Sequence, residues 1–248
     1  MISKKELKNY KKIAQYNLGQ AEKDYLQNII LFILYQEIGQ ELIFKGGTAL
    51  SKCFGSDRFS EDLDFTMLKK KNFQEIIEKG LKRFFLEYEV KEINTENSLN
   101  LIFRIKGPLY NGSRQSLCKI KLDFSKRETI EAAITNKKIG YYMDNLPVFE
   151  IVCMNLKEIL AEKVRTIYTR NKARDVYDIN FLINRKIDYD LKLINKKLSF
   201  YNLKFSVKTF KNKLLEKKGI WEREMKSLVK KTNDFEEVYQ NIVNYFKY

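Results

Sequence analysis

Histidine is absent from the 248 residues of this chain, and cysteine is scarce. The lack of histidine excludes Ser-His-Asp and Cys-His nucleophile sites, HExxH zinc sites and any histidine general base. The three cysteines, Cys53, Cys118 and Cys153, are widely spaced and form no CxxC pair. Because this pattern favours neither a disulfide framework nor a thiolate zinc site, we interpret all three as buried apolar residues in a reducing compartment.

Long apolar runs are also missing. The longest, Ile29–Tyr35, is far too short to span a bilayer. The lysine-rich N-terminus lacks the apolar core of a signal peptide. We therefore expect a soluble, cytoplasmic protein without a membrane partner.

Acidic residues are fewer than basic ones, with 32 Asp and Glu against 47 Lys and Arg, which leaves a net charge of +15. Such an excess favours a polyanionic partner, with nucleic acid ahead of an anionic membrane surface. The excess is concentrated in residues 154–248, which hold 22 basic and 12 acidic residues. This part is the better candidate for holding nucleic acid.

Hydrophobic periodicity predicts a mixed first part and a wholly helical second part. Strands are expected at 42–44, 59–66, 88–93, 99–106, 116–124 and 148–152, and the turn at 107–112 joins two of them as a hairpin. Helices are expected at 4–17, 20–38, 48–54 and 72–88, and later at 155–169, 174–182, 191–198, 207–215, 221–229 and 235–246. We place a domain boundary near Cys153, which gives an α+β domain at 1–153 and a basic helical bundle domain at 154–248.

The stretch FKGGTALSKCFGSDRFSEDLDF, residues 44–65, carries the strongest chemical pattern. An apolar strand turns at Gly46 and Gly47, and the next strand carries D-x-D. Asp62 and Asp64 share one face of that strand, because successive side chains alternate. Two carboxylates so placed repel each other unless a cation or a proton lies between them. Beside a glycine turn they indicate a divalent metal with phosphate, the site type that suits magnesium.

A third aspartate, Asp123, lies on the predicted strand 116–124 and shares a face with Lys119 and Lys121. We therefore expect it to lie in the same sheet as the D-x-D pair. The alternatives are an ordinary strand-end residue or an ion-pair partner of Lys121.

A second pattern follows on the predicted helices after residue 154. Lys163 and Arg170 share one stripe of a helix, and Arg174 and Asp175 open the next helix. On the pattern alone, the two cations also fit an exposed helical face. Asp175 also fits a first-turn residue that suits the helix dipole, or a partner of Arg174.

Taken together, the apolar strand, Gly-Gly, D-x-D and later aspartate resemble the nucleotidyltransferase superfamily that includes DNA polymerase β. More closely, KGGTALSK…RFSEDLDF at 45–65 and EILAEKVRTIYTRNKARDVYDI at 158–179 resemble the AbiEii/AbiGii abortive-infection toxins. That family includes the MenT-type toxins of type IV toxin–antitoxin systems. The resemblance covers residues 1–185, and the final sixty residues match no family pattern.

The resemblance implies a polymerase β-like mixed sheet flanked by helices and followed by a helical bundle. It also implies transfer of a nucleotide from an NTP to a nucleic-acid acceptor, such as the 3′ end of a tRNA, by a toxin that a cognate antitoxin neutralises. The implied cofactors are two Mg²⁺ ions, which Mn²⁺ can replace. Asp62 and Asp64 would bridge both ions, and Asp123 would bind the ion that activates the acceptor hydroxyl.

The implied nucleotide-binding group begins at the glycine turn, where Gly46 and Gly47 let the backbone approach the triphosphate. Thr48 and Ser51 would add hydroxyl donors at the start of a helix, where backbone N–H groups favour anions.

The second signature implies that Lys163 contacts phosphates and that Asp175 contributes to the active site. Arg170 and Arg174 are further candidate phosphate ligands. Two other functions stay open: nucleotide transfer to a protein or small molecule, and non-catalytic nucleic-acid binding on a transferase fold.

Overall fold

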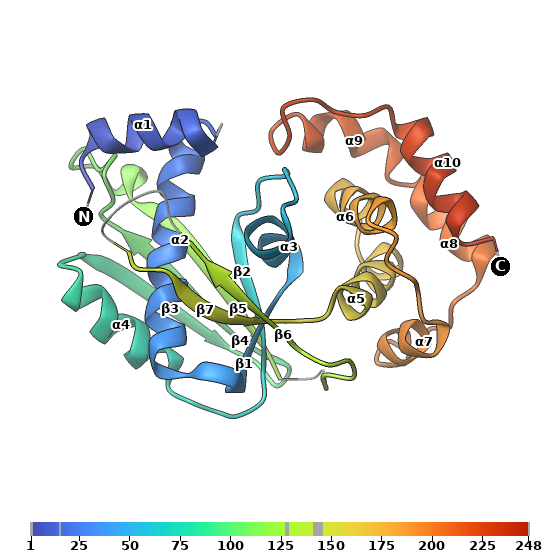
Figure 1. The fold of residues 1–248 in the computed structure, drawn as a ribbon, viewed down its shortest axis with the longest axis horizontal. Coiled ribbons are helices and arrows are strands. Elements are labelled where there is room, and N and C mark those ends of the chain that lie inside the picture. The colour runs from blue at the N-terminus through green and yellow to red at the C-terminus, as the bar shows by residue number, and fades with distance from the viewer. Residues whose placement is uncertain (1, 15, 127–128, 141–145, 248) are drawn as a thin grey trace. The chain divides into compact units, whose positions relative to one another are not determined.

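The structure is a computed structural model that describes residues 2–14, 16–126, 129–140 and 146–247 (Figure 1). The chain divides into two compact units. The first comprises Met1–Gly55, Phe59–Thr129 and Ile134–Cys153, and the second comprises Ser56–Arg58, Ile130–Ala133 and Met154–Tyr248. A short piece between the two strands of the first signature therefore belongs to the second unit.

A seven-stranded mixed sheet, counted over the described residues, forms the centre of the first unit in the order β3-β4-β5-β2-β1-β7-β6. The strands are β1 (Leu42–Lys45), β2 (Asp62–Met67), β3 (Tyr88–Asn94), β4 (Ser98–Ile105), β5 (Cys118–Ser125), β6 (Thr135–Ile139) and β7 (Phe149–Cys153). Strand β2 runs antiparallel to β1 and parallel to β5. The predicted hairpin is confirmed as the antiparallel pair β4 and β5.

The α-helices in the described part of this unit are α1 (Lys4–Ala14), α2 (Leu18–Glu37), α3 (Gly46–Phe54) and α4 (Phe73–Arg83). A capping box starts α2, in which the side chain of Asn17 accepts from the backbone of Gln20 and the Gln20 side chain accepts in return. Helix α4 ends at Arg83, earlier than predicted. Phe85 has a φ of 53°, a left-handed conformation that an α-helix cannot continue through.

A row of phenylalanines forms the core on one face of the sheet. The rings of Phe44 and Phe65 lie 5.3 Å apart, and those of Phe65 and Phe124 lie 5.1 Å apart. All three side chains are fully buried, and Phe73 of α4 stacks on Phe124 at 4.4 Å. Since side chains alternate along a strand, the residues next to these phenylalanines in β2 and β5 point to the opposite face.

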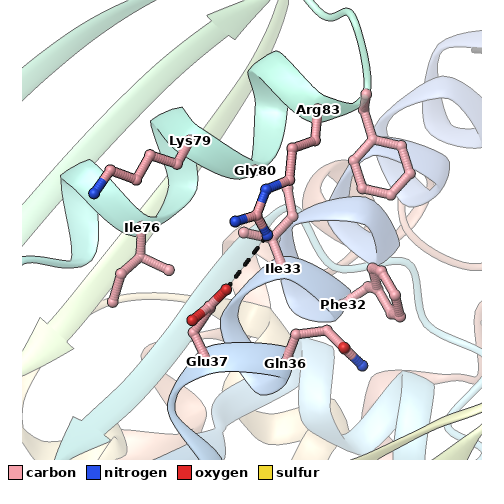
Figure 2. Close-up of a pocket in the computed structure, with 9 residues that line it drawn as sticks. Phe32, Ile33, Gln36, Glu37, Ile76, Lys79, Gly80 and Arg83 are labelled. Carbon is pink, nitrogen blue, oxygen red and sulfur yellow. Dashed lines mark hydrogen bonds and ion pairs between the residues drawn. The ribbon is translucent and has the colours of Figure 1, made fainter.

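Helices α2 and α4 pack against each other on the phenylalanine side. A Cβ on Gly80 would lie 2.3 Å from the side chain of Ile33, so the contact requires glycine. Beside it lies a pocket of about 330 Å³, whose rim includes an ion pair of 3.4 Å between Arg83 and Glu37 (Figure 2). Its nine lining residues include none of the predicted site residues.

The second unit is helical over all its described elements, as predicted: α5 (Leu156–Thr169), α6 (Ala173–Asn184), α7 (Leu191–Ser199), α8 (Val207–Leu215), α9 (Lys218–Met225) and α10 (Phe235–Tyr245). The last sixty residues supply much of its core. Phe210 and Phe246 pack at 5.0 Å, and buried Trp221 donates to the carbonyl of Asn233 at 2.9 Å.

Further local predictions also differ from the structure. Strand β6 was missed, because its sequence TNKKI is polar and it lies at the sheet edge. Strand β2 begins at Asp62, three residues later than expected, and Gly46 and Gly47 form the first turn of α3 instead of preceding it. In the parts of the chain that the structure covers, no helix combines the length and apolarity needed to cross a membrane.

Candidate active site

Three carboxylates gather on the polar face of β2 and β5. Asp64 pairs in register with Asp123 on the parallel neighbouring strand, and Asp62 lies two residues earlier on the same face of β2. All three are half-buried, whereas the intervening Leu63 is fully buried. Neighbouring strands are about 4.8 Å apart, so the paired aspartates are adjacent. We call Asp62, Asp64 and Asp123 the acidic row.

The strands on either side add one residue each to this arrangement. Lys45 of β1 is the register partner of Asp64, and Asn100 of β4 is the partner of Asp123. Lys45 is buried, with 7% of its surface exposed. The sheet therefore places a cationic and an amide side chain next to the carboxylates.

Gly46 connects β1 to α3 and lies directly against the acidic row. Its φ of 74° favours glycine, and a Cβ there would lie 2.4 Å from Oδ2 of Asp64. Glycine is thus needed twice, once for the backbone angle and once for the close approach. The expected reason was an approach to phosphate, and the structure adds this contact with Asp64.

The strand that carries Asp62 is held at its start by two buried side chains. Thr48, 1% exposed, donates its hydroxyl to the carbonyl of Asp62. Gln27 of α2, also 1% exposed, donates to the carbonyls of Ser60 (3.1 Å) and Glu61 (2.9 Å). Gln27 was not predicted, and its only signal is that it and Asn28 are the two polar residues before the apolar run Ile29–Tyr35.

The chemistry of the acidic row fits a magnesium site that the protein completes only in part. Carboxylate oxygens are the ligands that Mg²⁺ prefers, and phosphate-handling sites commonly use one or two carboxylates together with substrate phosphates and water. Among the described residues, no group of three or more Asp, Glu or Cys side chains is placed to hold a metal ion by itself. A metal ion at the acidic row would therefore need further ligands from substrate phosphate and water.

The second unit contains a buried cluster of charges centred on Lys163 of α5. Its Nζ lies 3.0 Å from Oδ1 of Asp175 and 2.6 Å from Oδ2 of Asp178. The two aspartates are three residues apart on α6, so they share one helical face. Neither exposes any surface, and Lys163 exposes 5%.

Two arginines complete this cluster through paired contacts. Arg170 binds Asp175 with Nε and Nη2, each at 2.7 Å, and Arg58 binds Asp178 with the same two nitrogens at 2.9 and 3.0 Å. Such two-point contacts are the strongest form of this ion pair. We call these five residues the ion-pair cluster, which contains three cations and two anions.

Burial alone raises the pKa of Asp175 and of Asp178, because it penalises the charged carboxylate. The nearby cations outweigh this effect. Lys163 and Arg170 hold the pKa of Asp175 below its usual range, and Arg58 and Lys163 do the same for Asp178. Both carboxylates are therefore ionised at neutral pH.

The structure assembles the predicted residues as two groups. The acidic row lies with Gly46, Gly47, Thr48 and Ser51 in the first unit, and Ser51 is half-buried on α3. Lys163, Asp175 and Arg170 meet in the second unit. Half-buried Arg174 makes no ion pair with the described residues. Asp178 and Arg58 are not among the predicted site residues, although both lie within the two signatures.

Comparison with known families identifies one that covers most of the chain. The sequence model of the nucleotidyl transferase AbiEii toxin family, of type IV toxin–antitoxin systems, matches residues 30–241. The match extends well beyond residue 185, so the helices of the final sixty residues belong largely to the family pattern. No curated protein sequence matches the chain significantly.

Solved structures show the same fold. JHP933 from Helicobacter pylori is 20% identical with a TM-score of 0.61, over 91% of this chain and 89% of that one. MenT4, a nucleotidyltransferase toxin from Mycobacterium tuberculosis H37Rv, is 16% identical with a TM-score of 0.66, over 100% of this chain and 89% of that one. These similarities confirm the predicted mixed sheet with flanking helices. With a family match over most of its length, the chain belongs to the AbiEii nucleotidyltransferase toxins of type IV toxin–antitoxin systems.

Proposed function

We propose that this nucleotidyltransferase moves an NMP from an NTP to an RNA acceptor, with Mg²⁺ held at the acidic row. The observation that carries this proposal is the register pairing of Asp64 with Asp123, with Asp62 on the same face and Gly46 in close contact. By resemblance to the family, the acceptor is the 3′ end of a tRNA.

Asp62, Asp64 and Asp123 are the proposed metal ligands, with Mn²⁺ as an alternative to Mg²⁺. Two bound ions would lower the pKa of the attacking hydroxyl and neutralise charge on the transferred phosphate. The protein contributes a fixed set of ligands. Thr48 and Gln27 hold the start of β2, so the carboxylates on that strand keep their spacing when the ions bind.

The first turn of α3 is the proposed triphosphate site. Gly46 and Gly47 add no side chain beside the backbone N–H groups of this helix start, where the helix dipole also favours anions. Ser51 supplies a further hydroxyl one turn later. The hydroxyl of Thr48 already donates to the carbonyl of Asp62, so we assign Thr48 to holding β2.

In the second unit, the ion-pair cluster is proposed to prepare a cationic surface for phosphate. Arg170 exposes 43% of its side chain while Asp175 fixes its guanidinium, and Arg174 is half-buried without an ion pair among the described residues. Lys163 exposes only 7% of its side chain and holds both aspartates. A direct contact between Lys163 and phosphate therefore requires one of those carboxylates to move.

The charge of residues 154–248 favours an RNA acceptor, because this part contains 22 basic and 12 acidic residues. Cationic residues that neutralise phosphates bind nucleic acid in a strongly salt-dependent way. As a type IV toxin, the protein would act in the cytoplasm, and a cognate antitoxin would counteract it.

The test is incubation of the protein with each α-labelled NTP, Mg²⁺ and total cellular RNA. We expect label in RNA with the wild type and with Asp188→Asn, which changes a side chain that is 84% exposed. We expect no label with Asp64→Asn, which keeps the side-chain size and removes the charge. Absence of label from every molecule with all four nucleotides would refute the enzymatic proposal.

The same experiment distinguishes the other two functions. Label in protein or in a small molecule would replace the RNA acceptor by that class. RNA binding that Asp64→Asn leaves intact, without transfer by the wild type, would identify a binding protein on a transferase fold.

A further inference from the structure

Two cysteines far apart in sequence meet inside the first unit. Cys53 lies in the last turn of α3, and Cys153 is the last residue of β7. Their sulfurs are 3.1 Å apart, with the thiol of Cys153 donating to the sulfur of Cys53. A disulfide bond is about 2.05 Å long, so the sulfurs need to approach by only about 1 Å to form one.

We propose that Cys53 and Cys153 form a redox site, which a peroxide converts into an intrachain disulfide between the last turn of α3 and the end of β7. This inference does not depend on the nucleotidyl acceptor. It also corrects the interpretation of all three cysteines as buried, since Cys53 is half-buried while Cys118 and Cys153 are buried.

The difference in exposure sets the order of the two steps. Cys53 reaches solvent, whereas Cys153 exposes no surface. Peroxide first oxidises the Cys53 thiol to a sulfenic acid and is itself reduced to water. The Cys153 sulfur then attacks the sulfenic sulfur, the S–O bond breaks, and the hydroxide leaves with the thiol proton as water. Two thiols are oxidised and one peroxide is reduced to two waters.

The surroundings make the first step slow and the second step fast. The hydrogen bond with Cys153 and burial raise the pKa of Cys53, and the nearby ammonium groups of Lys52 and Lys137 only partly oppose this shift. Little thiolate is therefore present at neutral pH, which slows attack on peroxide. Once the sulfenic acid forms, its partner is already in contact, so the disulfide outcompetes further oxidation.

The disulfide would restrain α3, the helix that we also propose as the triphosphate site. Helix α3 has nine residues, and its first residue, Gly46, lies against Asp64. If α3 binds the triphosphate as proposed, oxidation fixes the far end of the nucleotide-binding helix. Bond formation itself is measured without nucleotide, so its failure is distinguishable from failure of the proposed function.

The experiment treats the full-length protein with hydrogen peroxide, unfolds it, alkylates free thiols and measures the intact mass. We expect three alkylated thiols before treatment and one afterwards, with the Cys53 and Cys153 peptides cross-linked until dithiothreitol is added. Cys118→Ser keeps the pair and should still lose two thiols. Cys53→Ser, a change at a half-buried position, should lose none to a disulfide.

Three results would overturn the proposal: wild type that keeps three thiols, thiols lost to sulfinic acid without a cross-link, or a cross-link between two chains. Thermal unfolding gives a further check. Closing a loop of about a hundred residues should raise the Tm by roughly 5–10 °C in wild type and not in Cys53→Ser. A disulfide that lowers the Tm would show that the folded geometry does not accommodate it.

Discussion

The aspartates of the acidic row and those of the ion-pair cluster have different surroundings. In the first unit, Asp62, Asp64 and Asp123 are half-buried and gather on one sheet face. In the second unit, Asp175 and Asp178 are fully buried, and lysine and arginine nitrogens contact both carboxyl groups. Carboxylates of the second unit hold cations of the chain itself, and those of the first unit are the ligands that we propose for Mg²⁺.

We therefore expect substitutions in the two groups to affect different properties, activity in one case and stability in the other. A buried charge that loses its partner is left in a low-dielectric interior, which costs several kcal/mol. A half-buried carboxylate keeps part of its hydration, so its removal changes the folding free energy far less. Substitutions in the acidic row should therefore reduce activity, and substitutions in the ion-pair cluster should reduce stability.

The largest effect is expected for Asp64→Asn. Transfer of labelled nucleotide should fall by at least about 10³-fold, because a metal ligand worth several kcal/mol of transition-state stabilisation is lost. The free energy of unfolding, measured with urea, should change by less than about 1 kcal/mol. Substantial residual transfer, or a large loss of stability, would contradict the expectation that Asp64 serves activity and not stability.

Next comes Asp178→Ala, which leaves Arg58 and Lys163 buried without one of their partners. We expect a loss of about 3–5 kcal/mol in the free energy of unfolding. The matched control is Asp188→Ala, whose partner Lys157 is 3.9 Å away on the surface, with an expected loss below about 0.5 kcal/mol. Equal effects of the two substitutions would contradict a stabilising role for the cluster.

Gly46→Ala and Gly39→Ala form a matched pair, since both glycines have positive φ, 74° and 60°. Nothing lies within 4 Å of a Cβ on Gly39, so only backbone strain of about 1 kcal/mol is expected there. At Gly46 the clash with Asp64 should add to the strain, for a total of at least about 2 kcal/mol, together with loss of transfer. Equal stability losses, with transfer kept by both, would show that the contact with Asp64 is unimportant.

The smallest effect is the pH dependence of the ion-pair cluster. The folded pKa values of Asp175 and Asp178 lie below the unfolded value of 3.8, so their stabilisation is complete well above that pH. It is lost as the pH falls below 3.8 towards the folded values. The difference in unfolding free energy between wild type and Asp178→Ala should therefore shrink between pH 7 and about pH 3. A difference that grows on acidification would reverse the assigned direction of the shift.

Local pattern was enough to predict that β2, β5 and α3 exist, although not where β2 and α3 begin. Alternation along β5 placed Asp123 on the face opposite Phe124, and the spacing in D-x-D placed Asp62 with Asp64. The pairing of β2 with β5 was not predictable in the same way, because register depends on residues distant in sequence. The contact between Gly46 and Asp64 also depends on how β1, α3 and β2 pack, and no feature of the sequence indicates it.

The ion-pair cluster shows the same limit more strongly. Arg58 and Asp178 are 120 positions apart, so neither sequence motif indicates that they meet. The helix containing Lys163 and Arg170 was predicted from its apolar spacing, but the burial of Lys163 was not. A charged helical residue usually faces water, and the opposing aspartates of α6 reverse that preference for Lys163.

The parallel pairing of β2 and β5 also has a consequence for synthesis of the toxin. Asp64 and Asp123 are neighbours in the sheet but 59 positions apart along the chain. Contacts of such sequence separation form late, because the loop between them must be closed first. A ribosome that has made Asp62 and Asp64 has therefore not yet made an acidic row. The proposed active site is complete only when β5 has emerged and docked, well after the D-x-D motif has been translated.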